Sequence, residues 1–347
     1  MPAAAPAEAA TVERELGEAA PLGTPPRPLS PDAAAACGDR IRANLERTLR
    51  GKPEVVRRAV ETLVAGGHLL LEDVPGVGKT TLAHALARSI DGRFRRVQFT
   101  SDLLPADLLG AALPELSDGH ATGRFEFHPG PVFANVVLAD EINRASPKVQ
   151  SALLEAMAEQ SVTVDGVTHA LPTPFLVVAT QNPLDHHGTH PLPESQLDRF
   201  LVRRGIGYPD PEDEAAVLRD DPAATALPHL QPVVTTREIE ALQRTAATVK
   251  FGDALVTYLL RIVQQTREHE AIQVGVSPRG AIALRRAAQA RALLDGRAFC
   301  IPEDVRELAI DVLAHRMTID PHAHRDRRGE ETAWILREIL EQTHVPL

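Results

Sequence analysis

A glycine-rich segment between Pro75 and Thr81 carries a lysine and two threonines, and it follows an apolar run. Gly76 and Gly78 let backbone N–H groups point inward at phosphate oxygens, because a side chain at either position would block their approach. Lys79 supplies positive charge to the outer phosphates, and the Thr80 hydroxyl can bind Mg²⁺ beside the N-terminus of the next helix. These features predict a nucleoside triphosphate site. Its expected contacts are Pro75, Gly76, Val77, Gly78, Lys79, Thr80 and Thr81.

One position departs from the strict form of this pattern, which has glycine where this chain has Asp73. A strand is expected from Leu69, and the helical spacing of Leu82, Leu86 and Ile90 follows the segment. The alternative is a glycine-rich strand-to-helix turn that binds nothing. The flanking strand and helix favour the phosphate site.

A second acidic strand end follows at Val136–Asp140. Asp140, at the tip of a buried strand, can hold Mg²⁺ opposite Thr80, usually through water. Glu141 can orient and deprotonate the attacking water. The alternative is a pair of charges at a helix N-terminus, since a helix is expected after Ser146. The apolar strand and the spacing favour the catalytic interpretation.

A third strand, expected from Phe175 to Thr180, ends in a polar amide at Asn182. Such an amide can donate to the terminal phosphate or to the attacking water, so Asn182 is the candidate sensor. Alone, an asparagine before Pro183 is better explained as a turn former. Three polar strand ends together favour the sensor.

The elements that must position these residues alternate between strand and helix up to about Ile206, which predicts a parallel sheet wrapped by helices. After Pro209 the strand patterns stop. Amphipathic helices are expected over Phe251–Glu270, Pro278–Leu294 and Pro302–His315. Charged residues between their apolar positions are expected on solvated faces.

Before the sheet, residues 1–32 are rich in Ala and Pro and bury too little apolar surface to order, so a disordered tail is predicted. The first helical periodicity begins near Ile41. The predicted organisation is a tail (1–32), an α/β nucleotide-binding domain (33–208) and a helical domain (209–347).

The 347-residue chain has a net charge of −10, which argues against a dedicated nucleic-acid surface because duplex binding needs clustered Lys and Arg. It has no apolar run long enough for a transmembrane helix and no basic segment leading into an apolar core. A soluble, cytoplasmic protein is expected. Cys37 and Cys300 form neither a disulfide framework nor a C-x-x-C metal site.

An ordered set of motifs spans nearly the whole chain beyond the tail and resembles the MoxR family of AAA+ ATPases. The motifs are Val74–Thr80, Leu138–Ala145, Ala179–Pro183, Pro193–Phe200 and Ser277–Arg279. The resemblance implies an AAA+ P-loop ATPase that binds ATP and Mg²⁺. It also implies a site between neighbouring subunits of a ring, commonly a hexamer, and an all-α lid domain that closes over the nucleotide.

Two arginines receive roles from this resemblance. Arg199 matches the arginine finger, which reaches the phosphate of the adjacent subunit. The alternative is a surface salt bridge with Asp198 or Glu194. Arg279, in the first turn of a lid helix after Ser277, matches the second sensor, which reports the phosphate state to the lid.

Two segments go beyond plain nucleotide binding. Residues 103–132 are predicted to form a short helix and a hairpin, and residues 162–169 a tight hairpin around Asp165-Gly166. Their positions resemble the helix-2 and pre-sensor hairpin inserts of the AAA+ branch that contains MoxR and magnesium chelatase. By analogy they project toward a pore or a client, and the alternative is a pair of plain edge hairpins.

The segment Asp185–His190 contains three histidines and could bind Zn²⁺ or Ni²⁺. Exposed loop histidines are the better interpretation, because ATP hydrolysis requires no metal other than Mg²⁺ and short histidine tracts are often only compositional.

Three functions follow from the resemblance. The first is a chaperone-like ATPase that remodels a client protein or matures its metal cofactor, typically with a von Willebrand factor A domain partner. The second is a regulatory scaffold with slow turnover. The third is the ATPase subunit of a metal chelatase.

Overall fold

The computed structural model describes residues 26–117, 120–183, 188–320 and 331–345. Residues 1–25 of the predicted tail lie outside these ranges. The first helix, α1 (Pro31–Glu46), begins about ten residues before the expected position near Ile41 and includes the last two residues of the predicted tail. Its early start has a local cause, because the Ser30 hydroxyl caps the N–H of Ala33 and Pro31 occupies the first turn.

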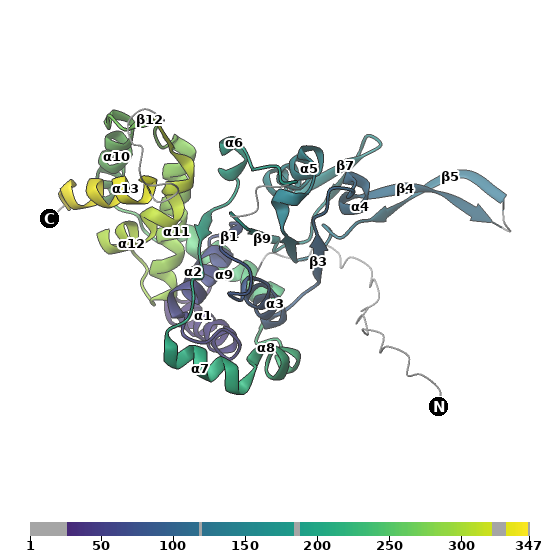
Figure 1. The fold of residues 1–347 in the computed structure, drawn as a ribbon, viewed down its shortest axis with the longest axis horizontal. Coiled ribbons are helices and arrows are strands. Elements are labelled where there is room, and N and C mark those ends of the chain that lie inside the picture. Colours follow the sequence, from purple (N-terminus) through teal and green to yellow (C-terminus); the bar gives the residue numbers. More distant parts are fainter. Residues whose placement is uncertain (1–25, 118–119, 184–187, 321–330, 346–347) are drawn as a thin grey trace.

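A five-stranded parallel sheet forms the centre of the molecule and confirms the predicted α/β class (Figure 1). Its strand order is β10-β1-β9-β6-β3. The strands are β1 (Leu69–Glu72), β3 (Phe94–Gln98), β6 (Val136–Asp140), β9 (Leu176–Gln181) and β10 (Val202–Arg204). Because all five are parallel, their carboxyl ends meet along one edge, where the polar strand ends lie.

Helices cover both faces of this sheet and explain why the central strands are almost wholly apolar. Alternate residues of β1 enter two different cores: Leu69 and Leu71 lie in one, and Leu70 in the other. The helices of this part are α2 (Pro53–Val64), α3 (Lys79–Ser89), α4 (Pro105–Leu109), α5 (Pro147–Glu159) and α6 (Glu194–Leu197).

Two hairpins are inserted, as predicted. The longer one, β4 (Gly110–Ser117) with β5 (His120–Pro129), projects from the body as an arm (Figure 1). The shorter one, β7 (Ser161–Val164) with β8 (Val167–Ala170), turns at Asp165-Gly166. The hairpins touch at their bases, where the rings of Phe127 and His169 stack with centroids 3.9 Å apart.

The rest of the chain is mainly helical, as predicted. Its helices are α7 (Pro211–Asp220), α8 (Pro222–Thr225), α9 (Thr236–Thr248), α10 (Asp253–Glu268), α11 (Pro278–Leu294), α12 (Pro302–Leu313) and α13 (Glu331–Gln342). The expectation that strands stop after Pro209 is wrong in detail, since β12 (Ile272–Val274) pairs with β13 (Thr318–Ile319). Likewise β11 (Val234–Thr235) pairs with β2 (Ile90–Asp91), so Ile90 ends α3 instead of continuing it.

Charged residues of the lid helices are not all solvated, which corrects a second expectation. Arg291, Asp304 and Asp311 are buried, with at most 5% of their surfaces exposed. Arg291 and Asp311 contact charged residues of α2, which has a strongly amphipathic sequence yet places Arg58 and Glu61 in the interior. The lid therefore meets the nucleotide-binding part through buried ion pairs as well as apolar contacts.

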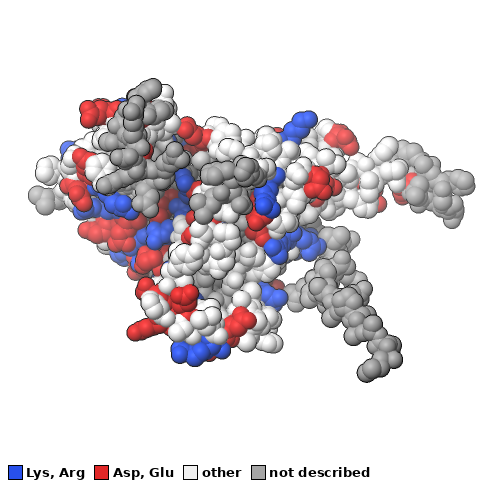
Figure 2. Space-filling model, viewed as in Figure 1, with Lys and Arg blue, Asp and Glu red and all other residues white. Residues whose placement is uncertain are grey.

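The outer surface carries both charges. On the face shown in Figure 2, acidic and basic side chains are interspersed, so this face does not form one basic surface. Among the described residues, no helix is long and apolar enough to cross a membrane.

Candidate functional site

The loop between β1 and α3 has the geometry that phosphate binding requires. Gly76 has φ +85° and Gly78 has φ +98°, a region of backbone conformation that favours glycine. A Cβ at Gly76 would meet nothing within 4 Å, so open space lies above the loop at this point. Thr80 and Thr81 lie in the first turn of α3, where free N–H groups and the helix dipole favour an anion. The predicted nucleotide contacts therefore share one concave backbone.

Lys79 begins α3 and turns back along the loop. Its ammonium group donates to the carbonyl oxygens of Asp73 and, at 3.1 Å, Val74, and it lies 3.4 Å from the carbonyl oxygen of Gln181. Burial lowers the pKa of Lys79, and the nearby carboxylates of Asp73 and Asp140 partly oppose this effect. The lysine thus joins the loop to the end of β9.

Asp140 ends β6 and is 7% exposed. Its Oδ1 accepts a hydrogen bond from the Thr180 hydroxyl at 2.6 Å, and its Oδ2 accepts from Nη2 of Arg96 at 2.6 Å. A carboxylate and the Thr80 hydroxyl are hard oxygen donors of the kind that suit Mg²⁺. The donor chemistry of these two predicted ligands fits that metal.

Glu141 leaves the strand direction at once, because its φ of +56° places it in the left-handed region. Its N–H donates to the Thr180 hydroxyl at 2.9 Å, which fixes the turn. Its Oε2 accepts from Nε2 of Gln98 at 3.0 Å and lies 3.3 Å from Nη1 of Arg144. Gln98 and Arg144 therefore hold the Glu141 carboxylate, whereas Thr180 and Arg96 hold the carboxylate of Asp140.

Arg96 and Gln98 are contacts that the sequence did not reveal. Both lie on β3, two residues apart, so their side chains leave the same face of the strand. Gln98 pairs with Asp140 in the β3–β6 register, which brings each side chain to one of the two carboxylates. Only the strand order could have indicated this, since nothing in the sequence shows that β3 lies next to β6.

Asn182, the candidate sensor, follows β9 directly and is 8% exposed. The backbone carbonyl oxygen of Asn182 lies 3.4 Å from Nδ2 of Asn143, a residue in the turn after Glu141. Parallel pairing places Glu72 of β1 opposite Gln181 of β9. The ends of β1, β6 and β9 are thus adjacent, and Lys79, Asp140, Glu141 and Asn182 lie at this edge of the sheet.

The two predicted arginines lie elsewhere, on a different part of the surface. Arg279 pairs through Nε with Oδ2 of Asp198 at 3.2 Å, and Arg316 donates to Oδ1 of the same carboxylate at 2.7 Å. Arg199, the next residue, forms no side-chain hydrogen bond or ion pair with the part of the chain that the structure describes. The alternative of a salt bridge from Arg199 to Asp198 or Glu194 is therefore not what the structure shows.

The histidine segment lies partly outside the described residues, because 184–187 are not among them. Within the described ranges, no three His, Cys, Asp or Glu side chains gather in a way that could hold a metal ion. His190 takes part through its backbone, donating to the carbonyl oxygen of Asn143 at 2.7 Å.

Comparison with known proteins agrees with this geometry. Residues 68–202 match the sequence model described as "ATPase family associated with various cellular activities (AAA)", and residues 264–339 match an AAA lid domain. "Chaperone MoxR1" of Mycobacterium tuberculosis is 40% identical, with 89% of this chain and 82% of the relative covered. "Protein MoxR" of Methylorubrum extorquens is 33% identical, with 91% and 96% covered.

Two further similarities cover nearly the full length of both chains. The uncharacterized protein YeaC of Bacillus subtilis is 48% identical, with 88% of this chain and 93% of that protein covered. A solved structure of a candidate ATPase from Cytophaga hutchinsonii is 35% identical and superposes with a TM-score of 0.81, covering 91% of this chain and 97% of the other.

Proposed function

The chain belongs to the MoxR family of AAA+ ATPases, and from this premise we propose that it hydrolyses ATP, with Mg²⁺, at a site completed by a neighbouring copy of the chain. The observation that carries the proposal is the meeting of the phosphate loop, Asp140 and Glu141 at the ends of three adjacent strands.

Each side chain has a distinct task in this proposal. The loop N–H groups and Lys79 would bind the phosphates, while Thr80 and Asp140 would hold Mg²⁺, whose charge would offset that of the transferred phosphoryl group. Glu141 takes the proton of the attacking water, and Asn182 orients that water or the terminal phosphate. Gln98 donates to Oε2 of Glu141 and so competes with the attacking water for this carboxylate.

The arginines support a site shared between copies of the chain. Arg199 lacks a partner among the described residues, and Arg279 lies on the adjacent Asp198. A guanidinium with no carboxylate partner among the described residues is a suitable donor to a phosphate supplied from outside the chain. We place both arginines at the nucleotide of the next subunit, which changes the expected role of Arg279 from its own lid to the neighbour's site.

Glu141→Gln tests the catalytic assignment. The variant should bind ATP as wild type does and lose hydrolysis by at least about 10²-fold, the range of general-base contributions. Undiminished turnover would refute the role of Glu141.

Mixing experiments test the shared site. Arg199→Ala added to wild type should lower the specific rate more steeply than dilution does, whereas Arg219→Ala, on the exposed surface of α7, should leave it unchanged. The mass in solution with ATP should be that of a ring of about six copies. Simple dilution kinetics from a monomer would refute the shared site.

The client-directed function is a chaperone-like remodelling of a protein, aided by a von Willebrand factor A domain partner in the cytoplasm. The name of the mycobacterial relative supports the chaperone part. In this chain the projecting arm supports it too, since Phe125 is 71% and Leu113 47% exposed there. Substituting both with Ser should leave basal hydrolysis unchanged and abolish any rate increase caused by an unfolded polypeptide. A retained increase would show that the arm does not contact clients.

A further inference from the structure

Asp73, which replaces the first glycine of the strict phosphate-loop pattern, binds a distant segment of the chain. Its Oδ2 accepts hydrogen bonds from the N–H groups of Ile206 at 2.8 Å and Gly207 at 2.6 Å. Its Oδ1 accepts from the N–H of Val74 at 2.7 Å. Three backbone donors on one carboxylate form a specific contact, because hydrogen bonds to a charged group are stronger than neutral ones. A glycine at position 73 could make none of them.

The segment bound by Asp73 is the joint between the sheet and the helical part. Gly207 has φ +70°, a value that favours glycine, and a Cβ on Gly205 would lie 3.3 Å from Oδ2 of Asp73. Ile206 between them is buried, and the next carbonyl, of Tyr208, accepts from Nζ of Lys52 at 2.6 Å. The joint is therefore held close to the first residues of the phosphate loop.

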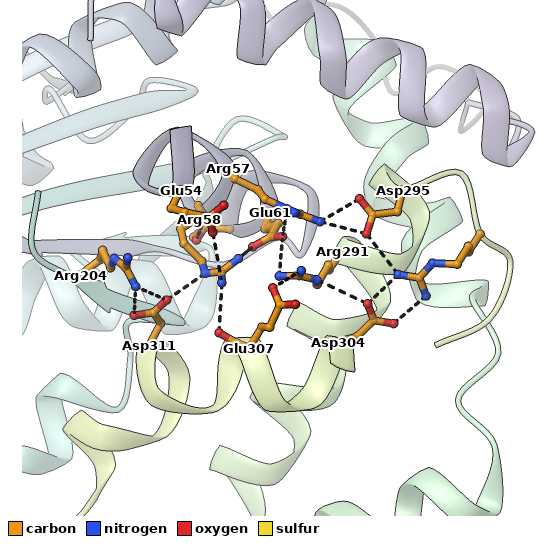
Figure 3. A network of polar contacts seen from close by, with 12 residues as sticks. Glu54, Arg57, Arg58, Glu61, Arg204, Arg291, Asp295, Asp304, Glu307 and Asp311 are labelled. Carbon is orange, nitrogen blue, oxygen red and sulfur yellow. Dashed lines mark hydrogen bonds and ion pairs between the residues drawn. The ribbon is translucent and has the colours of Figure 1, made fainter. Parts of the chain in front are cut away.

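Immediately before this joint, Arg204 binds the lid. Its Nη1 donates to both oxygens of Asp311 on α12, each at 2.9 Å. Asp311 also accepts from Nε of Arg58 at 2.8 Å, and the ion pairs continue from Arg58 through Glu61 to Arg291 (Figure 3). Most of these groups are buried, so solvent screens them little. A continuous set of polar contacts thus joins the loop to α11 and α12.

The other end of this set is the loop lysine. Lys79 donates to the carbonyl oxygens of Asp73 and Val74. The carboxylate of Asp73 in turn accepts from the N–H of Val74. A phosphate that attracts Lys79 competes with these two carbonyls. An occupant of the loop would therefore act on the backbone of residues 73 and 74, and the Asp73 carboxylate would pass a shift there on to Ile206 and Gly207.

We propose that Asp73 is a positioning residue that couples the phosphate loop to the lid, so that the nucleotide in the loop sets the position of α11 and α12. This inference rests on the proposed nucleotide site. Since Arg279 lies in the first turn of α11, the same coupling carries the state of one site to the next subunit.

Asp73→Gly is the decisive variant because it restores the strict motif and removes the tether, together with a carboxylate that acts on Lys79. With coupling, the affinity for mant-ATP should stay within about threefold of wild type, while kcat falls at least about tenfold, the equivalent of one lost charged hydrogen bond. Asp73→Asn keeps a side-chain oxygen acceptor and should retain much of the rate. If Asp73 only replaces a glycine, Asp73→Gly will match wild type.

Trp334, the sole tryptophan, lies on α13 and provides a direct readout of the lid. In a Glu141→Gln background, energy transfer from Trp334 to mant-ATP and to mant-ADP should differ, and the difference should vanish with Asp73→Gly. An unchanged difference would overturn the coupling. Lack of mant-ATP binding before the Asp73 change would instead refute the proposed function.

Arg204→Gln is a second variant, for use if Asp73→Gly does not fold. It leaves the loop intact and cuts the joint from Asp311. It should reduce the energy-transfer difference without changing the affinity for mant-ATP. A wild-type difference in Arg204→Gln would also overturn the proposal.

Discussion

Replacing Arg58 by Met should destabilise the protein through the carboxylates that it leaves behind. The Arg58 side chain is 4% exposed, and its guanidinium contacts Glu61 at 2.7 Å and Asp311 at 2.8 Å. Burial lowers the pKa of Arg58, but the charges of Glu61 and Asp311 outweigh it, so this pKa lies above its ordinary value. The arginine is therefore charged and bound to both carboxylates.

The size of the effect follows from what remains. Breaking a buried pair costs about 3–5 kcal/mol when one charge is left uncompensated. Here Glu61 keeps Arg57 at 3.1 Å, and Asp311 keeps Arg204 at 2.9 Å. We therefore expect the lower end, a loss of about 3 kcal/mol in the free energy of unfolding.

Urea unfolding at pH 7 measures this loss. Arg42→Met is the matched control, because Arg42 pairs with Asp39 on the surface and should cost no more than about 1 kcal/mol. Adding Glu61→Gln to Arg58→Met should recover part of the loss, because it removes a buried carboxylate that has lost one of its arginine partners. If Arg58→Met is no worse than the control, or if the second change recovers nothing, the uncompensated-charge argument is wrong.

Burial lowers the pKa of His68 to about 4. Above pH 6.5 this histidine therefore has no effect on the free energy of unfolding, and it lowers that free energy by about 3 kcal/mol as the pH drops toward 4. Measured by urea unfolding over this range, the free energy of unfolding should depend less on pH in His68→Gln than in wild type. An equal dependence on pH would contradict the role given to His68. Gly110→Ala should cost more than about 1 kcal/mol, because φ is +93° and the new Cβ would lie 2.2 Å from the carbonyl oxygen of His128. Gly252→Ala, with open space around its Cβ, should change thermal stability little, and equal effects of the two would refute the steric argument.

The features that the sequence predicted well depend on local chemistry. Asp165-Gly166 specifies the tight turn of β7–β8, and Ser277 with Pro278 begins α11 through a hydrogen bond to the N–H of Gly280. Parallel strands have their carboxyl ends along one edge of the sheet, so the fold class alone places Asp140 and Asn182 along the same edge.

The features that it did not predict depend on contacts between distant segments. The two-residue strand β2 exists only because Val234 lies beside Ile90. The periodicity of α2 predicts an apolar face. The burial of Arg58 and Glu61 could not be predicted, because the lid helices that cover them are distant in the sequence. The hydrogen bond from the N–H of Gly207 to Asp73 likewise joins residues far apart in the chain. Its one sign in the sequence was an aspartate where the strict phosphate-loop pattern has glycine.

The arm formed by β4 and β5 is supported at two places, its own base and the stack between Phe127 and His169. A two-stranded ribbon alone is marginally stable in water. Here β5 rests on β8 as well as on its own base, where Gly110 and Gly130 bring the backbones together. A displacement of the arm would also move β7–β8, and a short connection leads from β8 to β9, the strand that directly precedes Asn182. The arm and the polar strand ends are therefore connected through β7–β8.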